Sequence, residues 1–354
     1  MKVAVVPFYK SQLGGAFFDT KSRSNRDNAL DPFVSIKRIF QLQNIEVDTI
    51  DNVNMDEADG VIFFSLNISI LIKAFIKGKL NRSIYVSFEP PVVRPIHSPW
   101  ALKIVSKAFR KVLTWQDDLV GTNNFEKFFF PVPDLRHKVE IKNFKDRKFL
   151  TSIVGYKKYR AKNELYSQRI TAIRYFEKKY PKSFEFYGVG WSREKFPSYR
   201  GPVDSKLEVL KSYKFSICYE NEKEINGLIS EKIFDCFFAG VVPIYWGAKN
   251  IERYIPKECY IDKRDFSDYT SLGKYIDQIS SSQYYEYLSN IERFLESGCF
   301  EKHLSHCFAR KLMEAVVNEG EHKIKSFDVY VVLATLLINK VWVYLRNKTS
   351  RIYK

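Results

Sequence analysis

The stretch that most constrains the fold of this chain is residues 214–247. It begins with a strand-like run at 215–219, followed by a polar loop and then by Ser230, a residue type favoured at helix N-caps. Large apolar residues then recur at helical spacing as far as Gly240, and residues 241–246 are typical of a second buried strand. The pattern predicts a strand–loop–helix–strand unit whose helix begins at the mouth of a parallel sheet.

The first turn of this helix is suited to an anion. A helix N-terminus presents unpaired N–H groups and the positive end of the helix dipole, and both favour a phosphate. Lys232 adds a full positive charge there, and Glu231 adds acceptors for sugar hydroxyls. The residues themselves therefore indicate a site for a phosphorylated sugar around Ser230.

The same stretch resembles a known signature. The tripeptide YEN, a short loop with a glycine, the tripeptide SEK, an aromatic helix ending in AG, and the run VPIYWG together look like the donor-binding signature of glycosyltransferase family 10. These are the α-1,3/1,4-fucosyltransferases, which use GDP-fucose. Pro256 and the run CYIDKRDF at 259–266 continue the likeness, which covers the carboxy-terminal half well and the amino-terminal half thinly. One position departs: Leu228 stands where the family usually has an aromatic residue, so another nucleotide sugar stays open as the donor.

The amino-terminal half predicts a parallel, doubly wound sheet. Short apolar runs typical of strands alternate with two segments of helical periodicity, at 32–43 and 68–77. The predicted strands are residues 2–7, 45–50, 60–65, 83–88 and 111–115. Open sheets of this kind bind ligands at the carboxyl ends of their strands.

Glu89 stands at one of these strand ends, directly before Pro90 and Pro91, which stop the strand. In the resembling family, a strand-end glutamate in a similar context is the general base, so the resemblance implies that role for Glu89. A carboxylate placed there would take the proton of an acceptor hydroxyl as it attacks the donor. The alternative is that Glu89 caps a turn or pairs with Arg94.

The carboxy-terminal half repeats the alternation, with strands at 149–154 and 184–188 and helices at 163–180, 207–213 and 271–295. In the family, a helix after the first of these strands bears an arginine that holds the donor pyrophosphate. Spacing favours Arg169 over Arg174 for this role, and a solvated helix face is the alternative for either residue. The resemblance implies three groups of donor contacts: Arg169 on the pyrophosphate, Ser230 and Lys232 at the leaving GDP, and Glu220, Asn221 and Glu231 on ribose and fucose hydroxyls.

The net charge and the cysteine content indicate which kind of partner the protein binds and in which cellular compartment it is found. The net charge of +16 calls for an anionic partner, but the basic residues are dispersed and show no RNA-binding or zinc-finger pattern, so we expect no nucleic acid. Five cysteines without paired spacing indicate a reducing compartment. Because the first residues lack the apolar core of a signal peptide, we expect the protein in the cytoplasm.

Metal ligands are weakly indicated. The chain has no D-x-D triplet, and Asp117 and Asp118 are better explained as a solvated turn. We therefore expect no required cofactor and no essential divalent metal, with GDP-fucose as the co-substrate. On a single helix, Cys299, His303, His306 and Cys307 would lie close to one face and could bind zinc, but ordinary packing is the favoured reading.

The tail is a largely apolar run at 329–345, bordered by basic residues and interrupted by Asn339 and Lys340. It is short for a membrane span. We expect it to lie on an anionic membrane surface, a prediction supported by the basic amphipathic tail of many bacterial members of the resembling family. The alternative is a terminal helix that packs on the first domain.

These inferences predict an α/β chain of GT-B architecture, with two Rossmann-like doubly wound domains facing across a cleft. Residues 1–145 would bind the acceptor and carry the base, 146–322 would bind the nucleotide sugar, and 323–354 would form the tail. The expected function is inverting transfer of fucose from GDP-fucose to a glycan hydroxyl, in cell-surface polysaccharide or lipopolysaccharide synthesis. The expected location is the inner face of the cytoplasmic membrane. The alternatives are transfer from another nucleotide sugar, and a non-catalytic protein that binds glycans or membranes.

Overall fold

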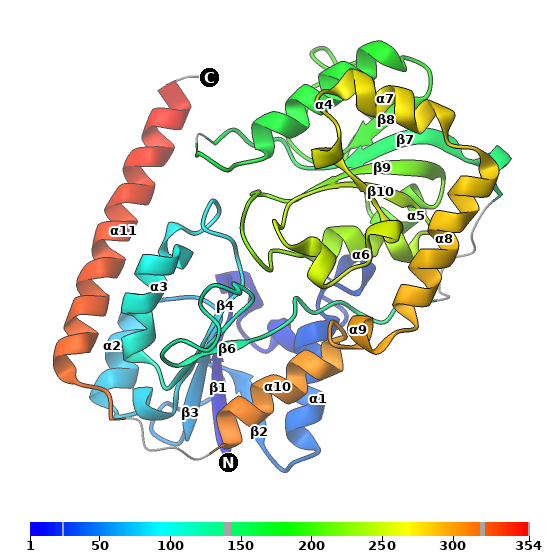
Figure 1. Cartoon of the computed structure of the whole chain (residues 1–354). Helices are drawn as coiled ribbons and strands as arrows, with labels where there is room; N and C mark the ends of the chain where they lie inside the picture. Colours follow the sequence, from blue (N-terminus) through cyan, green and yellow to red (C-terminus); the bar gives the residue numbers. More distant parts are fainter. Residues whose placement is uncertain (23–24, 137–142, 160, 319–322, 353–354) are drawn as a thin grey trace. The chain divides into compact units, whose positions relative to one another are not determined.

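The computed structural model describes residues 1–22, 25–136, 143–159, 161–318 and 323–352 (Figure 1). The chain divides into two compact units. Unit 1 consists of Met1–Pro133 together with His303–Lys354, and unit 2 consists of Asp134–Lys302. Each unit is a parallel α/β layer structure with its own hydrophobic core, as predicted.

Unit 1 contains a six-stranded sheet in the order β2-β1-β3-β4-β5-β6, and all neighbouring strands are parallel. The strands are β1 (Lys2–Val6), β2 (Glu46–Thr49), β3 (Gly60–Phe63), β4 (Ile84–Ser87), β5 (Lys111–Thr114) and β6 (Phe125–Lys127). The first five are confirmed within one or two residues at their ends. Strand β6 was not predicted, because two of its three residues are charged and it lies at the sheet edge, where no apolar run is required.

Helices cover both faces of this sheet. The helices of unit 1 are α1 (Asp31–Gln41), α2 (Ile68–Ile76), α3 (Pro99–Val105), α10 (Ser305–Val317) and α11 (Ser326–Ile352). Apolar residues of α2, α3 and α11 share one core with the strands, and α1 packs with α10 (Figure 1). Burial on both faces explains why the strands are nearly continuous apolar runs.

Unit 2 contains a five-stranded parallel sheet in the order β11-β10-β9-β7-β8. Its strands are β7 (Lys148–Ile153), β8 (Phe184–Tyr187), β9 (Tyr213–Tyr219), β10 (Val242–Trp246) and β11 (Ile261–Asp262). Its helices are α4 (Tyr166–Lys179), α5 (Lys206–Leu210), α6 (Glu231–Phe238), α7 (Tyr269–Gln278), α8 (Ser281–Leu295) and α9 (Gly298–Glu301). If the strands of each sheet are numbered from its own first strand, both sheets have the order 2-1-3-4-5 over five strands. Each sheet therefore has a topological switch point, between β1 and β3 in unit 1 and between β7 and β9 in unit 2.

The chain passes between the units at places that differ from the expected limits of 145 and 322. It enters unit 2 after Pro133 and returns to unit 1 at His303. The return is fixed by a short bridge, in which the N–H of Val132 donates to the carbonyl of His303 at 2.8 Å and the N–H of Ser305 donates to the carbonyl of Val132 at 3.0 Å. Helix α10 then buries Phe308 and Leu312 in unit 1. This long-range packing leaves no local mark in the sequence.

Two further predictions are corrected. The single helix expected at 271–295 is wrong, because Ile279 is extended and Ser280 starts α8 with a capping box to Gln283. The second correction concerns the tail, which was expected to lie on a membrane surface. Val329, Val332 and Leu336 of α11 are buried in the core of unit 1, so the packed-helix alternative holds for this face of the helix.

Candidate active site

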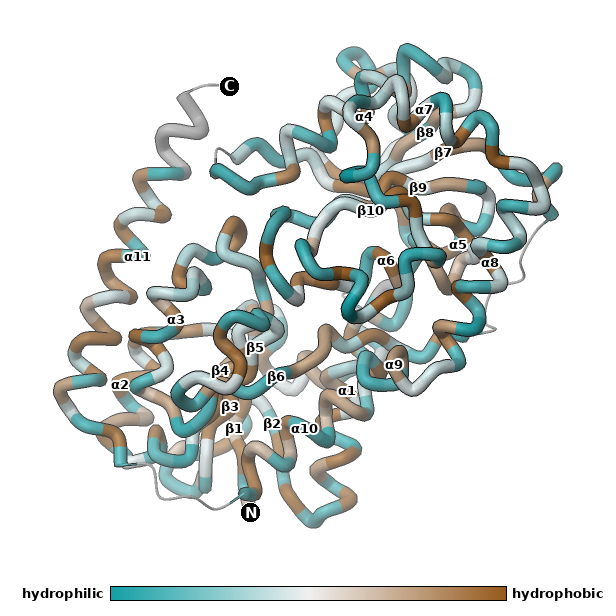
Figure 2. The backbone as a smooth tube through the Cα atoms, in the orientation of Figure 1, coloured by the Kyte–Doolittle hydropathy of each residue, from teal (hydrophilic) through white to brown (hydrophobic). Residues whose placement is uncertain are grey.

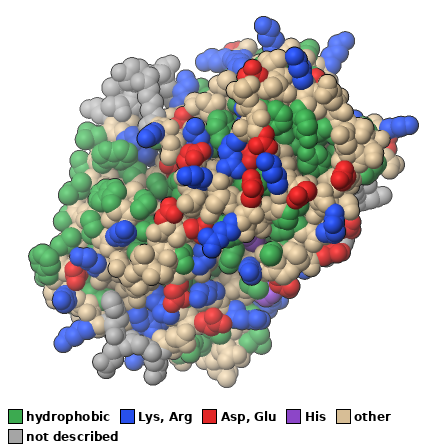
Figure 3. Space-filling view, in the orientation of Figure 1, with side chains coloured by type: hydrophobic (Ala, Val, Ile, Leu, Met, Phe, Trp, Pro, Cys, Tyr) green, Lys and Arg blue, Asp and Glu red, His purple; other side chains and the backbone are tan. Residues whose placement is uncertain are grey.

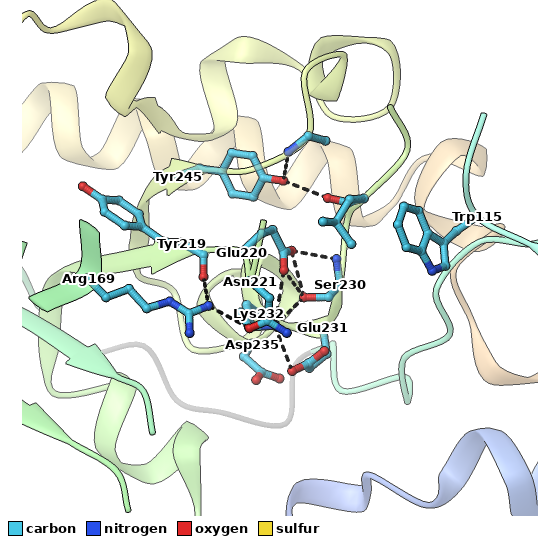
Figure 4. A network of polar contacts seen from close by, with 12 residues as sticks. Trp115, Arg169, Tyr219, Glu220, Asn221, Ser230, Glu231, Lys232, Asp235 and Tyr245 are labelled. Atoms are coloured by element: carbon cyan, nitrogen blue, oxygen red, sulfur yellow. Dashed lines mark hydrogen bonds and ion pairs between the residues drawn. The ribbon is translucent and has the colours of Figure 1, made fainter. Parts of the chain in front are cut away.

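The candidate donor site lies at the switch point of unit 2, where open α/β sheets bind ligands. Strand β9 ends at Tyr219, and the next residues, Glu220 and Asn221, turn toward the beginnings of α4 and α6 (Figure 4). The N–H of Leu165, the N-cap of α4, donates to the carbonyl of Asn221 at 3.0 Å, which ties the first turn of that helix to the strand end.

Glu220 is the centre of a buried polar network (Figure 4). Its side chain is only 1% exposed. Both carboxylate oxygens accept from the hydroxyl of Ser230 at 2.8 Å, one accepts from the N–H of Ser230 at 2.8 Å, and Lys232 Nζ lies 3.3 Å away. Glu220 was predicted to contact donor hydroxyls, but in this structure its oxygens hold the loop that leads into α6. Its direct partners are therefore protein groups.

Ser230 is the N-cap of α6, as predicted, but its hydroxyl makes no capping hydrogen bond. The hydroxyl donates to Glu220 instead and accepts from Lys232 Nζ at 2.8 Å. An N-cap side chain normally satisfies one of the free N–H groups of the first turn. Because the Ser230 side chain points elsewhere, it does not occupy these N–H groups, and an incoming anion can accept from this turn.

Arg169 projects from α4 into the same region. Its side chain is 5% exposed, and Nη2 donates to the carbonyl of Tyr219 at 2.7 Å and to Asn221 Oδ1 at 3.0 Å. Its buried Nε meets no acceptor within the described part of the chain. A buried guanidinium with an unused N–H retains the capacity to donate to one more acceptor. Arg174, by contrast, is exposed, pairs with Glu177 at 3.2 Å and stacks on Phe196.

The charges at the start of α6 are stable over a wide pH range. Burial opposes the charge on Lys232, yet the carboxylates of Glu220 and Glu231 hold the pKa of Lys232 above its ordinary value. Burial would raise the pKa of Glu231, but Lys232 and Lys206 lower that pKa to about 2. The site therefore keeps a fixed ammonium group and a fixed carboxylate at neutral pH.

Residues that were not singled out from the sequence shape the loop before α6. Tyr245 donates through its hydroxyl to the carbonyl of Leu228 at 3.1 Å and accepts from the N–H of Ala248 at 2.9 Å. Asn250 accepts from the N–H of Gly227, whose φ of +83° suits glycine. Leu228, the position that departs from the resembling family, is itself buried at 3% exposure.

The candidate base lies in unit 1. Glu89 is half-buried two residues beyond the end of β4, and the backbone around it is held on both sides. Trp115 Nε1 donates to the carbonyl of Phe88 at 2.8 Å, and His97 Nδ1 donates to the carbonyl of Glu89 at 2.5 Å. Neither contact was predicted: Trp115 is 27 residues from Phe88, and His97, although only eight residues from Glu89, reaches its carbonyl through the fold of the intervening turn. They fix the point from which the Glu89 side chain leaves the sheet.

The ring of His97 is neutral in this arrangement. A carbonyl oxygen can only accept, so Nδ1 carries the proton, and Nε2 then accepts from the hydroxyl of Tyr85. The ring is 1% exposed, and burial lowers the pKa of His97 to about 4. A protonated ring would lose its bond from Tyr85.

We predict a corresponding pH dependence of stability. The unfolded chain takes up a proton at His97 near its ordinary pKa of 6.5, whereas the folded chain does so only near 4. The free energy of unfolding should therefore be highest above pH 6.5 and fall by roughly 3 kcal/mol as the pH drops to 4. Urea unfolding between pH 7 and 4.5 measures this. His97→Asn should be less stable at pH 7 but lose this slope, and an unchanged slope in the variant would contradict the assignment. Glu231, with its pKa of about 2, contributes to the slope only at lower pH.

The residues weighed as zinc ligands are divided between two helices. Cys299 is exposed on α9, whereas His306 and Cys307 belong to α10, and His303 lies between the helices. His303 Nδ1 donates to the carbonyl of Phe130 at 3.2 Å. Over the described ranges, no group of three or more His, Cys, Asp or Glu side chains is arranged to hold a metal ion.

Comparison with known proteins points to one family. Residues 156–321 match the profile described as glycosyltransferase family 10 (fucosyltransferase), C-terminal. Among curated relatives, an alpha-(1,3)-fucosyltransferase of Helicobacter pylori is 34% identical over 74 residues, which are 21% of this chain and 15% of the relative. The mouse 4-galactosyl-N-acetylglucosaminide 3-alpha-L-fucosyltransferase 9 is 29% identical over 138 residues, 35% of this chain and 36% of the relative. The chain thus spans well under half the length of these relatives.

Solved structures extend the likeness to nearly the whole chain. A crystal structure of an alpha1,3-fucosyltransferase superposes with a TM-score of 0.56 at 14% identity, covering 92% of both chains. Anabaena HepE, solved with UDP and glucose, superposes with a TM-score of 0.54 at 10% identity, covering 89% of this chain and 99% of that one. At such identities these matches establish the fold, and the predicted GT-B class is confirmed.

Proposed function

Residues 156–321 match the glycosyltransferase family 10 profile, and from this match we propose that the chain transfers fucose from GDP-fucose to a hydroxyl group of a glycan. The observation that carries the proposal is the start of α6, where the N-cap Ser230 makes no capping hydrogen bond and the half-buried ammonium group of Lys232 lies 2.8 Å from its hydroxyl. The two curated relatives described above are named as fucosyltransferases, and a similar structure was solved with GDP-fucose; both support the choice of donor.

In this proposal the donor pyrophosphate binds at the first turn of α6. Lys232 and the free N–H groups would stabilise the negative charge that develops on GDP as the glycosidic bond breaks. Arg169 would add the positive charge of its guanidinium group from α4. Asn221 and Glu231 would orient the ribose and fucose hydroxyls, and Glu220 would keep Ser230 and Lys232 in position.

Glu89 would act as the general base. An acceptor hydroxyl is a poor nucleophile, and a carboxylate that takes its proton during attack on the anomeric carbon makes the displacement feasible. A single displacement by that hydroxyl inverts the anomeric configuration. The rigid backbone on both sides of Glu89 supports this role, since a base has to be held within hydrogen-bond reach of the proton it removes.

The alternative donor is a nucleotide sugar other than GDP-fucose. It is motivated by the buried Leu228, which stands where the resembling family usually has an aromatic residue. The test is release of the nucleoside diphosphate from a panel of nucleotide sugars without acceptor. GDP-fucose should be hydrolysed fastest. Hydrolysis of a different nucleotide sugar would favour the second donor, and no hydrolysis of any would favour a non-catalytic binding protein.

We also propose that the reaction needs no divalent metal, because Lys232, Arg169 and the α6 N–H groups supply positive charge at the leaving diphosphate. Transfer should therefore persist in excess EDTA at close to the rate in its absence. Coupled detection of GDP at fixed donor and acceptor concentrations measures this. Loss of activity that Mn²⁺ or Mg²⁺ restores would refute the prediction.

We propose further that the protein acts at the inner face of the cytoplasmic membrane, in cell-surface polysaccharide or lipopolysaccharide synthesis. The support is the outer face of α11. Apolar residues recur along the helix (Figure 2), and exposed apolar side chains gather on its surface (Figure 3). The exposed apolar residues of α11 are Phe327, Tyr330, Leu337, Ile338, Val341, Trp342, Tyr344 and Leu345. By length and composition, residues 326–346 are also sufficient to cross a membrane. Because the other face of α11 is packed on unit 1, we favour a helix that lies on the surface.

This placement predicts binding to acidic liposomes that weakens as salt is added, since each basic residue near the surface contributes roughly 1 kcal/mol. Deleting the tail is a poor test, because α11 carries core residues. Replacing the exposed Ile338 and Val341 with glutamate removes the apolar contact without touching that core, and should abolish flotation with the liposomes. A protein that ignores acidic liposomes, or a double variant that floats like the wild type, would contradict the proposal.

A further inference from the structure

A cavity of about 480 Å³ opens in unit 1 and has no role in the proposals above. It is lined by the residues that follow β1, β2 and β3, among them Pro7, Asp51 and Ser65. It therefore lies at the carboxyl edge of the sheet, at the switch point between β1 and β3. This is the position in unit 1 that corresponds to the candidate donor site in unit 2, and it is where an open α/β sheet places a ligand.

The cavity is lined by more positive than negative charge. Lys10, Lys73 and Arg94 contribute cationic side chains, and within the described part of the chain none of them forms an ion pair. Asp51 is the acidic residue of the lining, and its Oδ2 already accepts from the N–H of Gly14 at 2.7 Å. Cations that the protein leaves unpaired around a hollow attract an anionic ligand.

The helix that borders the cavity adds to this field. Asn67, the N-cap of α2, lies in the lining, and its side chain accepts from the N–H of Ile70 at 3.2 Å. The positive end of the α2 dipole is thus directed to the same edge. Tyr9 also lines the cavity and is 60% exposed, which gives an aromatic surface of the kind that sugar rings contact.

Arg94 connects the cavity with the candidate base. Its N–H donates to the carbonyl of Pro90 at 3.0 Å, and the N–H of His97 donates to the carbonyl of Arg94 at 2.8 Å. The same His97 holds the carbonyl of Glu89. Glu89 and Arg94 therefore belong to one fixed turn after β4, so a ligand group bound at Arg94 would be positioned relative to the base.

We infer that this cavity binds an acidic group carried by the acceptor, so that the acceptor is an anionic glycan. The inference rests on the proposed function, because it assigns the cavity to the acceptor of that reaction. A carboxylate, as in a uronic acid, and a phosphate ester share the required chemistry. The cationic residues would bind the acidic group and the aromatic surface would contact its sugar.

The test measures binding to the full chain without donor, by ligand-observed NMR. The probes are methyl β-galactoside, the matching galactosiduronate, the matching 6-phosphate, and inorganic phosphate alone. We expect at least one acidic glycoside to bind about tenfold or more tightly than the neutral one at low salt, and the advantage to shrink with added salt. The two acidic glycosides separate a carboxylate from a phosphate, and inorganic phosphate shows whether the sugar is needed.

Variants locate the effect. Lys73→Gln combined with Arg94→Gln should remove the preference for the acidic glycoside. Lys103→Gln is the matched control, since it removes an exposed charge from α3, outside the cavity. Equal binding of the acidic and neutral glycosides, tighter binding of inorganic phosphate than of either acidic glycoside, or a preference that survives the double substitution would overturn the inference. Donor hydrolysis without acceptor is measured in parallel. If the wild type hydrolyses GDP-fucose but shows no charge preference, the proposed function stands and this inference fails.

Discussion

Replacing Glu89 with glutamine is expected to slow fucose transfer by about 10²–10⁴-fold, the usual contribution of a general base. Glutamine keeps the size and the hydrogen-bonding reach of the side chain but cannot take a proton. The contacts that hold this turn, from Trp115 and His97, are made to backbone carbonyls, so the substitution leaves them in place. The affinity for GDP-fucose should change little, because the candidate donor residues belong to unit 2.

A pH profile makes this prediction specific. The wild-type kcat/KM should rise with pH as the base ionises, and this acidic limb should be absent in Glu89→Gln. Glu46→Gln, at an exposed position of β2, is a control for a generic loss of one carboxylate. If Glu89→Gln keeps near-normal turnover, or if donor affinity falls together with turnover, Glu89 is not the base.

Replacing Arg169 with glutamine is expected to weaken GDP-fucose binding by about 10–10²-fold, since hydrogen bonds to charged groups contribute about 1.5–3 kcal/mol. Part of the loss would be indirect, because Arg169 also holds the carbonyl of Tyr219 and the side chain of Asn221. Isothermal titration with GDP-fucose gives the affinity, and thermal unfolding reports any loss of stability. Arg169→Lys keeps the charge but offers fewer donors, so it should lie between the wild type and the glutamine variant.

The same helix supplies the control. Arg174 is exposed on α4 and is occupied by Glu177 and Phe196, so Arg174→Gln should bind GDP-fucose like the wild type. If the two glutamine variants lose equal affinity, the effect comes from the net charge of α4. If only Arg174→Gln weakens binding, the residue chosen from the sequence is wrong.

How much could be predicted from the sequence depended on how local each feature is. The unit from β9 to β10 was predicted almost to the residue, because its strand pattern, N-cap and helical periodicity all lie within one short stretch. The two parallel sheets followed from the same kind of local alternation. The contacts of Glu220 were not predictable, because which oxygens Ser230 and Lys232 occupy depends on how the intervening loop folds back.

Features that depend on distant partners were missed. The contact of Trp115 with the Phe88 carbonyl, the cavity after β1, β2 and β3, and the packing of α10 on α1 each join segments far apart in the chain. Tail helix α11 has one feature that was predictable from the sequence and one that was not. Its apolar composition was evident, but only its packing shows that Val329 and Val332 are core residues while Ile338 and Val341 are exposed.

The central claim is inverting transfer of fucose from GDP-fucose, and the anomeric configuration of the product tests it most directly. The wild-type protein, GDP-fucose and a panel of neutral and acidic glycans are incubated in EDTA, and the anomeric proton of the new fucosyl residue is assigned by NMR. We predict a fucosylated product with the configuration opposite to that of the donor, formed about 10²–10⁴-fold more slowly by Glu89→Gln under the same conditions. A product that retains the donor configuration, or consumption of another nucleotide sugar with no fucosylated product, would contradict the account.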